Sequence, residues 1–70
     1  MKYTVEVKTK SGTPISDMPG LTETQAKRAA KQAAEDNPQA LVFIHWYRSS
    51  DQQHGYLNPN GNHAITGKAW

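Results

Sequence analysis

Polar and apolar residues alternate with a period of two at the start of the chain. Every second side chain from Lys2 to Lys10 is charged or a threonine, and the apolar residues between them are Tyr3, Val5 and Val7. Alternation with β-branched residues is typical of a strand that has one buried face. We therefore predict a strand over Lys2–Lys10.

A turn and a second strand are predicted next. Ser11-Gly12 predicts the turn, because glycine adopts positive φ angles without steric cost. A short strand over Thr13–Asp17 would pair with the first. Pro14 places that strand at an edge of the sheet, since proline cannot donate to a neighbouring strand. Met18-Pro19-Gly20 is predicted to end it.

A helix capped by Thr22 and running to about Asp36 follows. Thr22 and Gln25 have the spacing of a capping box, in which each side chain bonds the backbone N–H of the other residue. Pro38 ends the helix, because proline disfavours helical geometry in the residue before it. At about 100° per residue the apolar positions form one stripe made only of alanine: Ala26, Ala29, Ala30, Ala33 and Ala34. Such a stripe buries little area but lets the helix lie close to a sheet.

The segment Ala40–Arg48 is apolar at both odd and even positions, which predicts a central strand. Its two faces carry, respectively, Val42, Ile44 and Trp46, and Phe43, His45 and Tyr47. If the first set meets the helix, the second set faces outward; in the opposite register Trp46 is the exposed aromatic residue. Either register predicts an apolar-aromatic surface that binds a partner, or that a homodimer buries.

Two further strands complete the predicted sheet. One covers Gln53–Leu57, and the other covers His63–Trp70, after the Asn58–Asn62 turn. The order is β-β-α-β-β-β, which predicts an α+β fold: an antiparallel sheet of four to five strands with one helix packed on one face. Seventy residues allow a single domain, 1–70.

Composition argues against an enzyme. The chain is only 70 residues long, its carboxylates are few and scattered, and no glycine-rich loop is present. We therefore expect a non-enzymatic protein without a cofactor. No run approaches the roughly 18 apolar residues of a membrane span, and no basic-then-apolar start suggests a signal peptide, so we expect a cytoplasmic protein.

Three cations share the face of the predicted helix opposite the alanines: Lys27, Arg28 and Lys31. The formal net charge is only +2, so this clustering matters more than the total. The three side chains would hold phosphates or an acidic protein surface. The alternative is an ordinary solvated face, in which Glu23 and Glu35 pair with lysines four residues away.

Aromatic residues close to cations form a second candidate binding site. Tyr47 and Arg48 are adjacent, Tyr56 is on the following strand, and Lys68 comes two residues before Trp70. Such residues stack bases and hold phosphates on the surface of a sheet. Part of the aromatic residues must instead form the core of so small a domain.

The histidines are spaced by nine residues: His45, His54 and His63. Antiparallel hairpins with suitable turns would place them side by side, where three imidazoles bind zinc and leave an open coordination position for hydrolysis. A one-residue slip in either register moves one histidine to the other face. We interpret them as polar strand residues, with a metal site as the alternative.

The run from Leu21 to Lys31, with Gln25-Ala26-Lys27-Arg28 in it, resembles the helix of small phage-type anti-CRISPR proteins that act on the type I-F Csy (Cascade) surveillance complex. The C-terminal Gly67-Lys68-Ala69-Trp70 resembles the Gly-Lys-x-Trp of that family, and the order of elements is similar. The long aromatic strand Val42–Tyr47 and the turn after Leu57 depart from the family pattern.

The resemblance implies inhibition by occupancy, without catalysis. Such a protein binds protein subunits of a type I CRISPR-Cas effector in the bacterial host cytoplasm and blocks target DNA binding. The family's basic helix positions fall on Lys27, Arg28 and Lys31, with Lys68 as a fourth, and they would contact acidic groups or hold DNA non-specifically. From the residues alone, the alternative is a stand-alone DNA- or RNA-binding module with a basic helix and an aromatic sheet face, as a monomer or homodimer.

Overall fold

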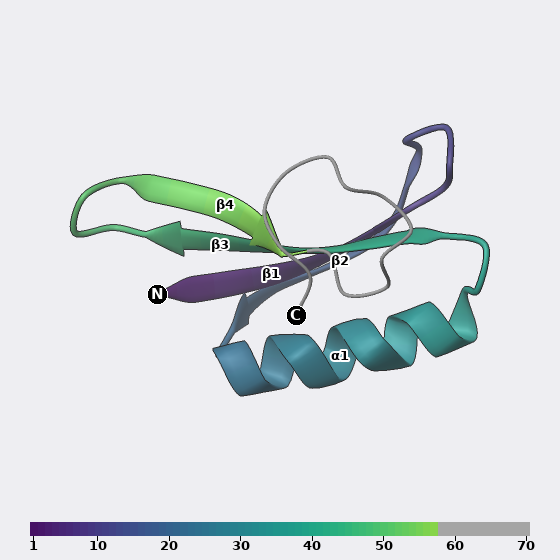
Figure 1. Cartoon of the computed structure of the whole chain (residues 1–70), viewed down its shortest axis with the longest axis horizontal. Coiled ribbons are helices and arrows are strands. Elements are labelled where there is room, and N and C mark those ends of the chain that lie inside the picture. The colour runs from purple at the N-terminus through teal and green to yellow at the C-terminus, as the bar shows by residue number, and fades with distance from the viewer. Residues whose placement is uncertain (58–70) are drawn as a thin grey trace.

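The computed structural model describes residues 1–57, which form one antiparallel sheet and one helix (Figure 1). The elements are β1 (Lys2–Lys8), β2 (Pro14–Leu21), α1 (Glu23–Asp36), β3 (Leu41–Arg48) and β4 (Gln53–Leu57). The strand order is β2-β1-β3-β4, and α1 packs on one face of the sheet. The predicted α+β fold is confirmed. The predicted turn Asn58–Asn62 and strand His63–Trp70 lie outside the described residues.

The helix begins where the capping box predicts. The Thr22 hydroxyl accepts from the backbone N–H of Gln25 at 3.2 Å, and the Gln25 side-chain oxygen accepts from the backbone N–H of Thr22 at 3.0 Å. At the other end, the backbone N–H of Asn37 donates to the Ala33 carbonyl at 2.9 Å. No helix within residues 1–57 is long and apolar enough to cross a membrane.

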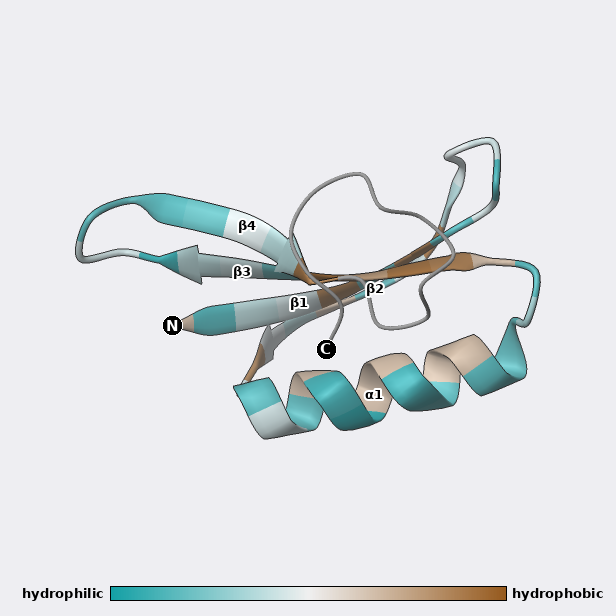
Figure 2. Ribbon diagram, viewed as in Figure 1, coloured by the Kyte–Doolittle hydropathy of each residue, from teal (hydrophilic) through white to brown (hydrophobic). Residues whose placement is uncertain are grey.

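The core lies between α1 and the sheet face that we call the helix face. Its β-strand residues are Tyr3, Val5, Val7, Val42, Ile44 and the half-buried Trp46. Val5 lies opposite Ile44 in the β1–β3 ladder, and all atoms of both residues are buried. The helix contributes the buried alanines Ala26, Ala30 and Ala33. Because alanine carries only a methyl group, the helix backbone lies close under the apolar centre of the sheet, as Figure 2 shows.

The opposite side of the sheet, which we call the far face, carries the alternate positions. Its members around β3 and β4 are Phe43, His45, Tyr47, His54 and Tyr56. The structure therefore has the first of the two predicted registers. The far face is not uniformly exposed: Phe43 is 6% exposed and packs edge-on against Tyr56, whereas Tyr47 is 43% exposed. The predicted outward position of Phe43 is thus right in direction, but this side chain is buried.

Strand β2 is longer than predicted, because Met18-Pro19-Gly20 does not end it. Between the pairs Tyr3–Leu21 and Val5–Met18, β2 contains one residue more than β1, which makes a bulge. Pro19 and Gly20 occupy this bulge, and Gly20 has a positive φ of 72°. An edge strand tolerates this geometry, since its outer side has no ladder to break. Among the strands of residues 1–57, β2 lies at an edge of the sheet, as predicted.

Candidate binding surfaces

The basic face of α1 consists of Lys27, Arg28 and Lys31, on the side of the helix away from the buried alanines. Arg28 and Lys31 are exposed, and Lys27 is half-buried. Spacings of three and four residues bring the three side chains together on the surface of a helix. The structure therefore brings these three predicted site residues together.

The three cations differ in their partners. Lys27 lies 4.0 Å from the Glu23 carboxylate, in the i,i+4 arrangement that the sequence allows. Within residues 1–57, neither Arg28 nor Lys31 forms an ion pair, and the Lys31–Glu35 pair is not made. An exposed pair such as Lys27–Glu23 contributes little free energy. Two of the three charges are therefore available to a partner.

Tyr47 and Arg48 point to opposite sides of β3. Tyr47 lies on the far face, whereas the Arg48 guanidinium lies 6.0 Å from the ring centroid of Trp46, on the helix-face side. Trp46 also covers Gly55 of β4, where an added Cβ would lie only 2.9 Å from the indole ring. Tyr47 and Arg48 therefore lie on different surfaces although they are adjacent in the sequence. A base stacked on Tyr47 would not contact the charge of Arg48.

Arg48 is committed to the turn between β3 and β4. Its Nε and Nη2 donate to the two carboxylate oxygens of Asp51 at 2.9 and 2.7 Å. The Arg48 hydrogen bond holds the pKa of Asp51 below its ordinary value, and the bond to Asp51 raises the pKa of Arg48. Asp51 also accepts from the backbone N–H of Gln53 at 3.2 Å. Arg48 therefore stabilises the turn and does not present a free charge to a partner.

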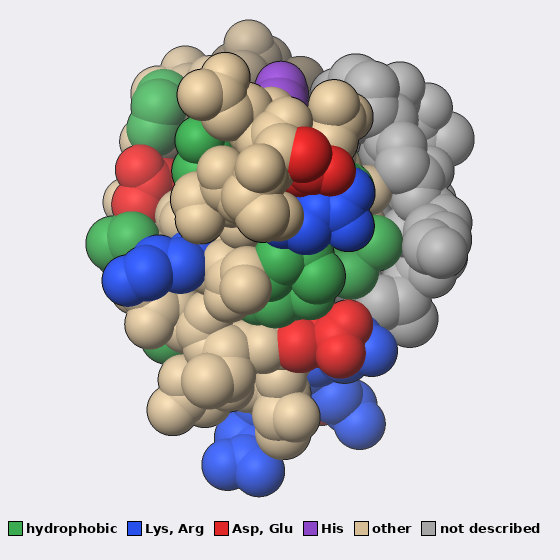
Figure 3. All heavy atoms as spheres, turned by 90° about the vertical axis from the view of Figure 1, so that its left-hand side faces the viewer, with side chains coloured by type: hydrophobic (Ala, Val, Ile, Leu, Met, Phe, Trp, Pro, Cys, Tyr) green, Lys and Arg blue, Asp and Glu red, His purple; other side chains and the backbone are tan. Residues whose placement is uncertain are grey.

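The basic face and the far face lie on opposite sides of the two-layer molecule. Seen from its end, several Lys and Arg side chains lie at the bottom, on the helical side, and others lie at the level of the sheet, while histidine emerges at the top (Figure 3). One flat partner surface therefore cannot contact both. Of the remaining predicted site residues, Tyr56 is half-buried on the far face, and Lys68 lies outside the described residues.

His45 and His54 come together on the far face, as their spacing allows. The β3–β4 register pairs His45 with Tyr56 and Tyr47 with His54, so the two histidines are diagonal neighbours. His45 Nε2 and His54 Nδ1 are 3.2 Å apart, and the ring centroids are 5.4 Å apart. His63 lies outside the described residues. Within residues 1–57 no group of three or more His, Cys, Asp or Glu residues forms a metal-binding cluster.

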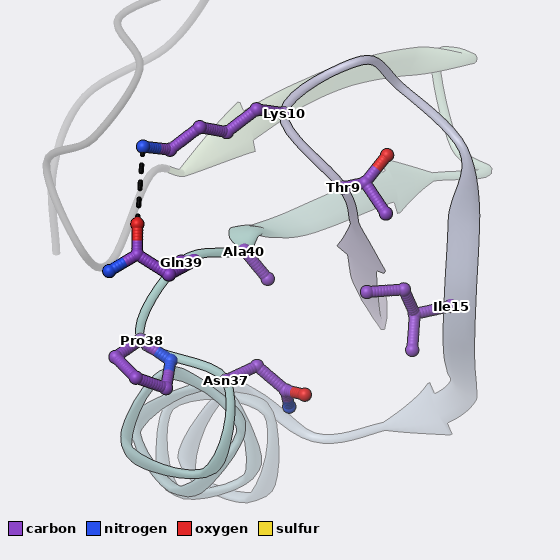
Figure 4. Close-up of a pocket in the computed structure, with 7 residues that line it drawn as sticks. All are labelled: Thr9, Lys10, Ile15, Asn37, Pro38, Gln39 and Ala40. Atoms are coloured by element: carbon purple, nitrogen blue, oxygen red, sulfur yellow. Dashed lines mark hydrogen bonds between the residues drawn. The ribbon is translucent and has the colours of Figure 1, made fainter.

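A pocket of about 410 Å³ lies between the β1–β2 hairpin and the segment after α1 (Figure 4). Its walls come from Thr9, Lys10, Ile15, Asn37, Pro38, Gln39 and Ala40. Lys10 Nζ donates to Gln39 Oε1 at 3.3 Å and joins the two sides. Among the described residues that line it, Lys10 is the only one with an ionisable side chain, so these walls offer contact rather than acid–base chemistry.

Sequence reasoning missed two of these features. The Arg48–Asp51 pair has a signal, namely opposite charges three residues apart across a turn. The pocket has none, since its walls come from segments that only the tertiary structure brings together.

Comparison with known proteins identifies no relative. Neither a protein-family model, nor a curated protein, nor a solved structure matches this chain.

Proposed function

We propose that this chain is a non-enzymatic binding protein that occupies the surface of a nucleic-acid-handling complex through the basic face of α1. The observation that carries the proposal is the pair of exposed cations Arg28 and Lys31, which have no ion partner within residues 1–57. Charges held on an ordered helix keep their spacing, so a complementary acidic or phosphate surface binds them without first ordering a loop.

The way α1 is held supports the same proposal. The capping box at Thr22 defines the start of the helix, and the buried alanines bring its inner face close to the sheet. The outer face of such a helix is a stable platform. Electrostatic complementarity then gives rate and specificity of association even where the contact area is modest.

The partner we propose is a type I CRISPR-Cas effector, because residues 21–31 resemble the helix of anti-CRISPR proteins that act on the type I-F Csy complex. On this proposal the chain works in the cytoplasm of a bacterial host. It binds protein subunits along the path of the target DNA and blocks DNA binding by occupancy. Since the far face lies on the other side of the molecule, contact through the basic face leaves Tyr47 and His54 free of that partner.

The test is a competition assay. A purified type I-F effector is mixed with labelled target duplex, and the concentration of this protein that blocks duplex binding is measured. We expect the wild type to block binding, and R28E/K31E to require at least about tenfold more protein, since reversing contact charges costs 1.4 kcal/mol or more. Far-UV circular dichroism should stay unchanged, because both side chains are exposed.

The matched control is K2E/K10E. Both double variants replace two lysines or arginines by glutamates and change the net charge by four units, from +2 to −2. Lys2 and Lys10 are exposed and lie outside α1, on β1 and after its end, and K10E removes only the exposed hydrogen bond from Lys10 to Gln39. Equal loss in the two variants would contradict a site on α1, and a wild type that does not block the effector would contradict this partner.

The second candidate function is a stand-alone nucleic-acid-binding module, which the same two unpaired cations favour. If Arg28 and Lys31 each neutralise one phosphate, the logarithm of the affinity for bare duplex should fall against the logarithm of salt concentration with a slope of about −2. A mobility-shift titration measures this slope. Absence of binding at low salt would contradict this second function and leave the first intact.

A further inference from the structure

The histidine pair on the far face has the geometry of a chelate. Two imidazole nitrogens bound to one metal at about 2.0–2.1 Å are roughly 2.9 Å apart at a right angle and roughly 3.3 Å apart at the tetrahedral angle. The 3.2 Å between His45 Nε2 and His54 Nδ1 falls between these two separations. The 71° angle between the ring planes also keeps the rings from stacking face to face.

The surroundings hold the pair in place. β3 and β4 are joined by a regular ladder from Ile44–Leu57 to Arg48–Gln53, and the Arg48–Asp51 pair fixes the turn between them. His45 is half-buried and packs against the ring of Tyr56, with centroids 4.8 Å apart. His54 is exposed, so a metal ion and its water ligands reach the pair from solvent. A site whose ligands are already positioned loses little conformational entropy on binding.

We propose that His45 and His54 form a two-histidine site for a divalent transition-metal ion, with water in the remaining coordination positions. Imidazole suits Cu²⁺, Ni²⁺ and Zn²⁺, and at a given nitrogen site Cu²⁺ binds most tightly of the three. Hard cations such as Mg²⁺ need oxygen ligands and do not compete. The site is independent of the basic face of α1, which lies on the other side of the sheet.

The hydrogen bond between the two rings is the metal-free form of the site. One ring donates its N–H and the other accepts. When the metal binds, the donating ring carries its proton on its other nitrogen, and both facing nitrogens present lone pairs to the ion.

Calorimetric titration of the full chain with Cu²⁺, Ni²⁺ and Zn²⁺ tests the proposal. We expect one ion per chain, with Cu²⁺ bound most tightly. H54Q should weaken binding at least about tenfold, because even loss of a group that only supports a ligand costs about 10–100-fold. H45Q should do the same. His54 is exposed, so H54Q should retain the wild-type fold by circular dichroism.

The matched control is H63Q, which also removes one of the three histidines. It should bind within about twofold of the wild type, since the proposed site consists of His45 and His54. In NMR spectra Zn²⁺ should shift the ring signals of His45 and His54. Equal affinity of wild type and H54Q would overturn the proposal, as would loss of binding in H63Q, or one ion per two chains.

Discussion

The two faces of the sheet differ in what their side chains do. On the helix face, Val5, Val7, Val42 and Ile44 are buried by the alanine stripe of α1 and form the core. On the far face, β1 presents the polar residues Thr4 and Glu6, while β3 and β4 present aromatic rings and histidines. The first face is uniform and apolar, whereas the second combines polar and aromatic groups in one ladder.

In a chain of this size, the helix face contributes most of the stability, and the far face carries the side chains that are able to bind a ligand. The apolar area that resists unfolding is concentrated on the helix face, since burial of apolar surface is the main favourable contribution to folding. The far face also buries Leu41 and Phe43, but around His45 and His54 it is under less constraint from packing. Its residues can approach one another for other reasons, as His45 and His54 do.

The largest expected change in stability that tests the difference between the two faces comes from substitutions at two neighbouring residues of β1. Val5 and Thr4 have nearly the same shape but lie on the helix face and the far face, respectively. V5A should lower the free energy of unfolding by about 2–3 kcal/mol, because it removes fully buried methyl groups and leaves a cavity. T4A should cost less than about 1 kcal/mol. Chemical denaturation of both variants measures the difference, and equal losses would show that the faces are not distinct in packing.

A smaller effect tests how the helix layer is fixed. T22A removes the hydroxyl that accepts from the Gln25 N–H, so it should lower the free energy of unfolding by about 1 kcal/mol. T24A, two residues later on the exposed first turn, makes the same chemical change without removing a cap and should stay within about 0.5 kcal/mol of the wild type. If T24A cost as much as T22A, the cap would not be what holds the start of α1.

The smallest expected effect is the pH dependence of the stability that Asp51 contributes in the β3–β4 turn. Because the pKa of Asp51 is lowered in the folded chain, its contribution to stability is present above its unfolded pKa and is lost as the pH falls through the folded pKa. D51N should therefore be slightly less stable than the wild type at neutral pH. The difference should begin to shrink as the pH falls to about 4, where unfolded aspartate takes up its proton, and should vanish only below the folded pKa of Asp51. Thermal unfolding of both proteins across this range measures it, and a difference that grows on acidification would contradict the role of Asp51.

Local sequence signals predict much of the fold. The capping box at Thr22 and the proline at position 38 define α1, because both act within a few residues. The apolar run in β3 predicts its central place, and Pro14 predicts the edge place of β2. The prediction that Met18-Pro19-Gly20 ends β2 is wrong, since a bulge opposite β1 accommodates Pro19 and Gly20.

Some of the candidate surfaces follow from local sequence patterns, and others depend on the tertiary structure. The basic face of α1 follows from helical periodicity, so Lys27, Arg28 and Lys31 are grouped by the sequence itself. Tyr47 and Arg48 are neighbours in the sequence but lie on opposite sides of β3, and Arg48 is bound to Asp51. The pocket beside Ile15 needs contact between the β1–β2 hairpin and the segment after α1, which no local pattern indicates.

By itself, the sequence determines one helix with an alanine side and a basic side, an edge strand and a central strand, and an α+β arrangement. Only the tertiary structure decides the register of β3, because this strand is apolar at both odd and even positions and either face is able to meet the helix. That single choice buries Ile44 against α1 and sets His45 beside His54 on the far face. The physical reason is the two-residue period of a strand. A shift by one residue would exchange the two faces, and the core would then be built from the other set of side chains.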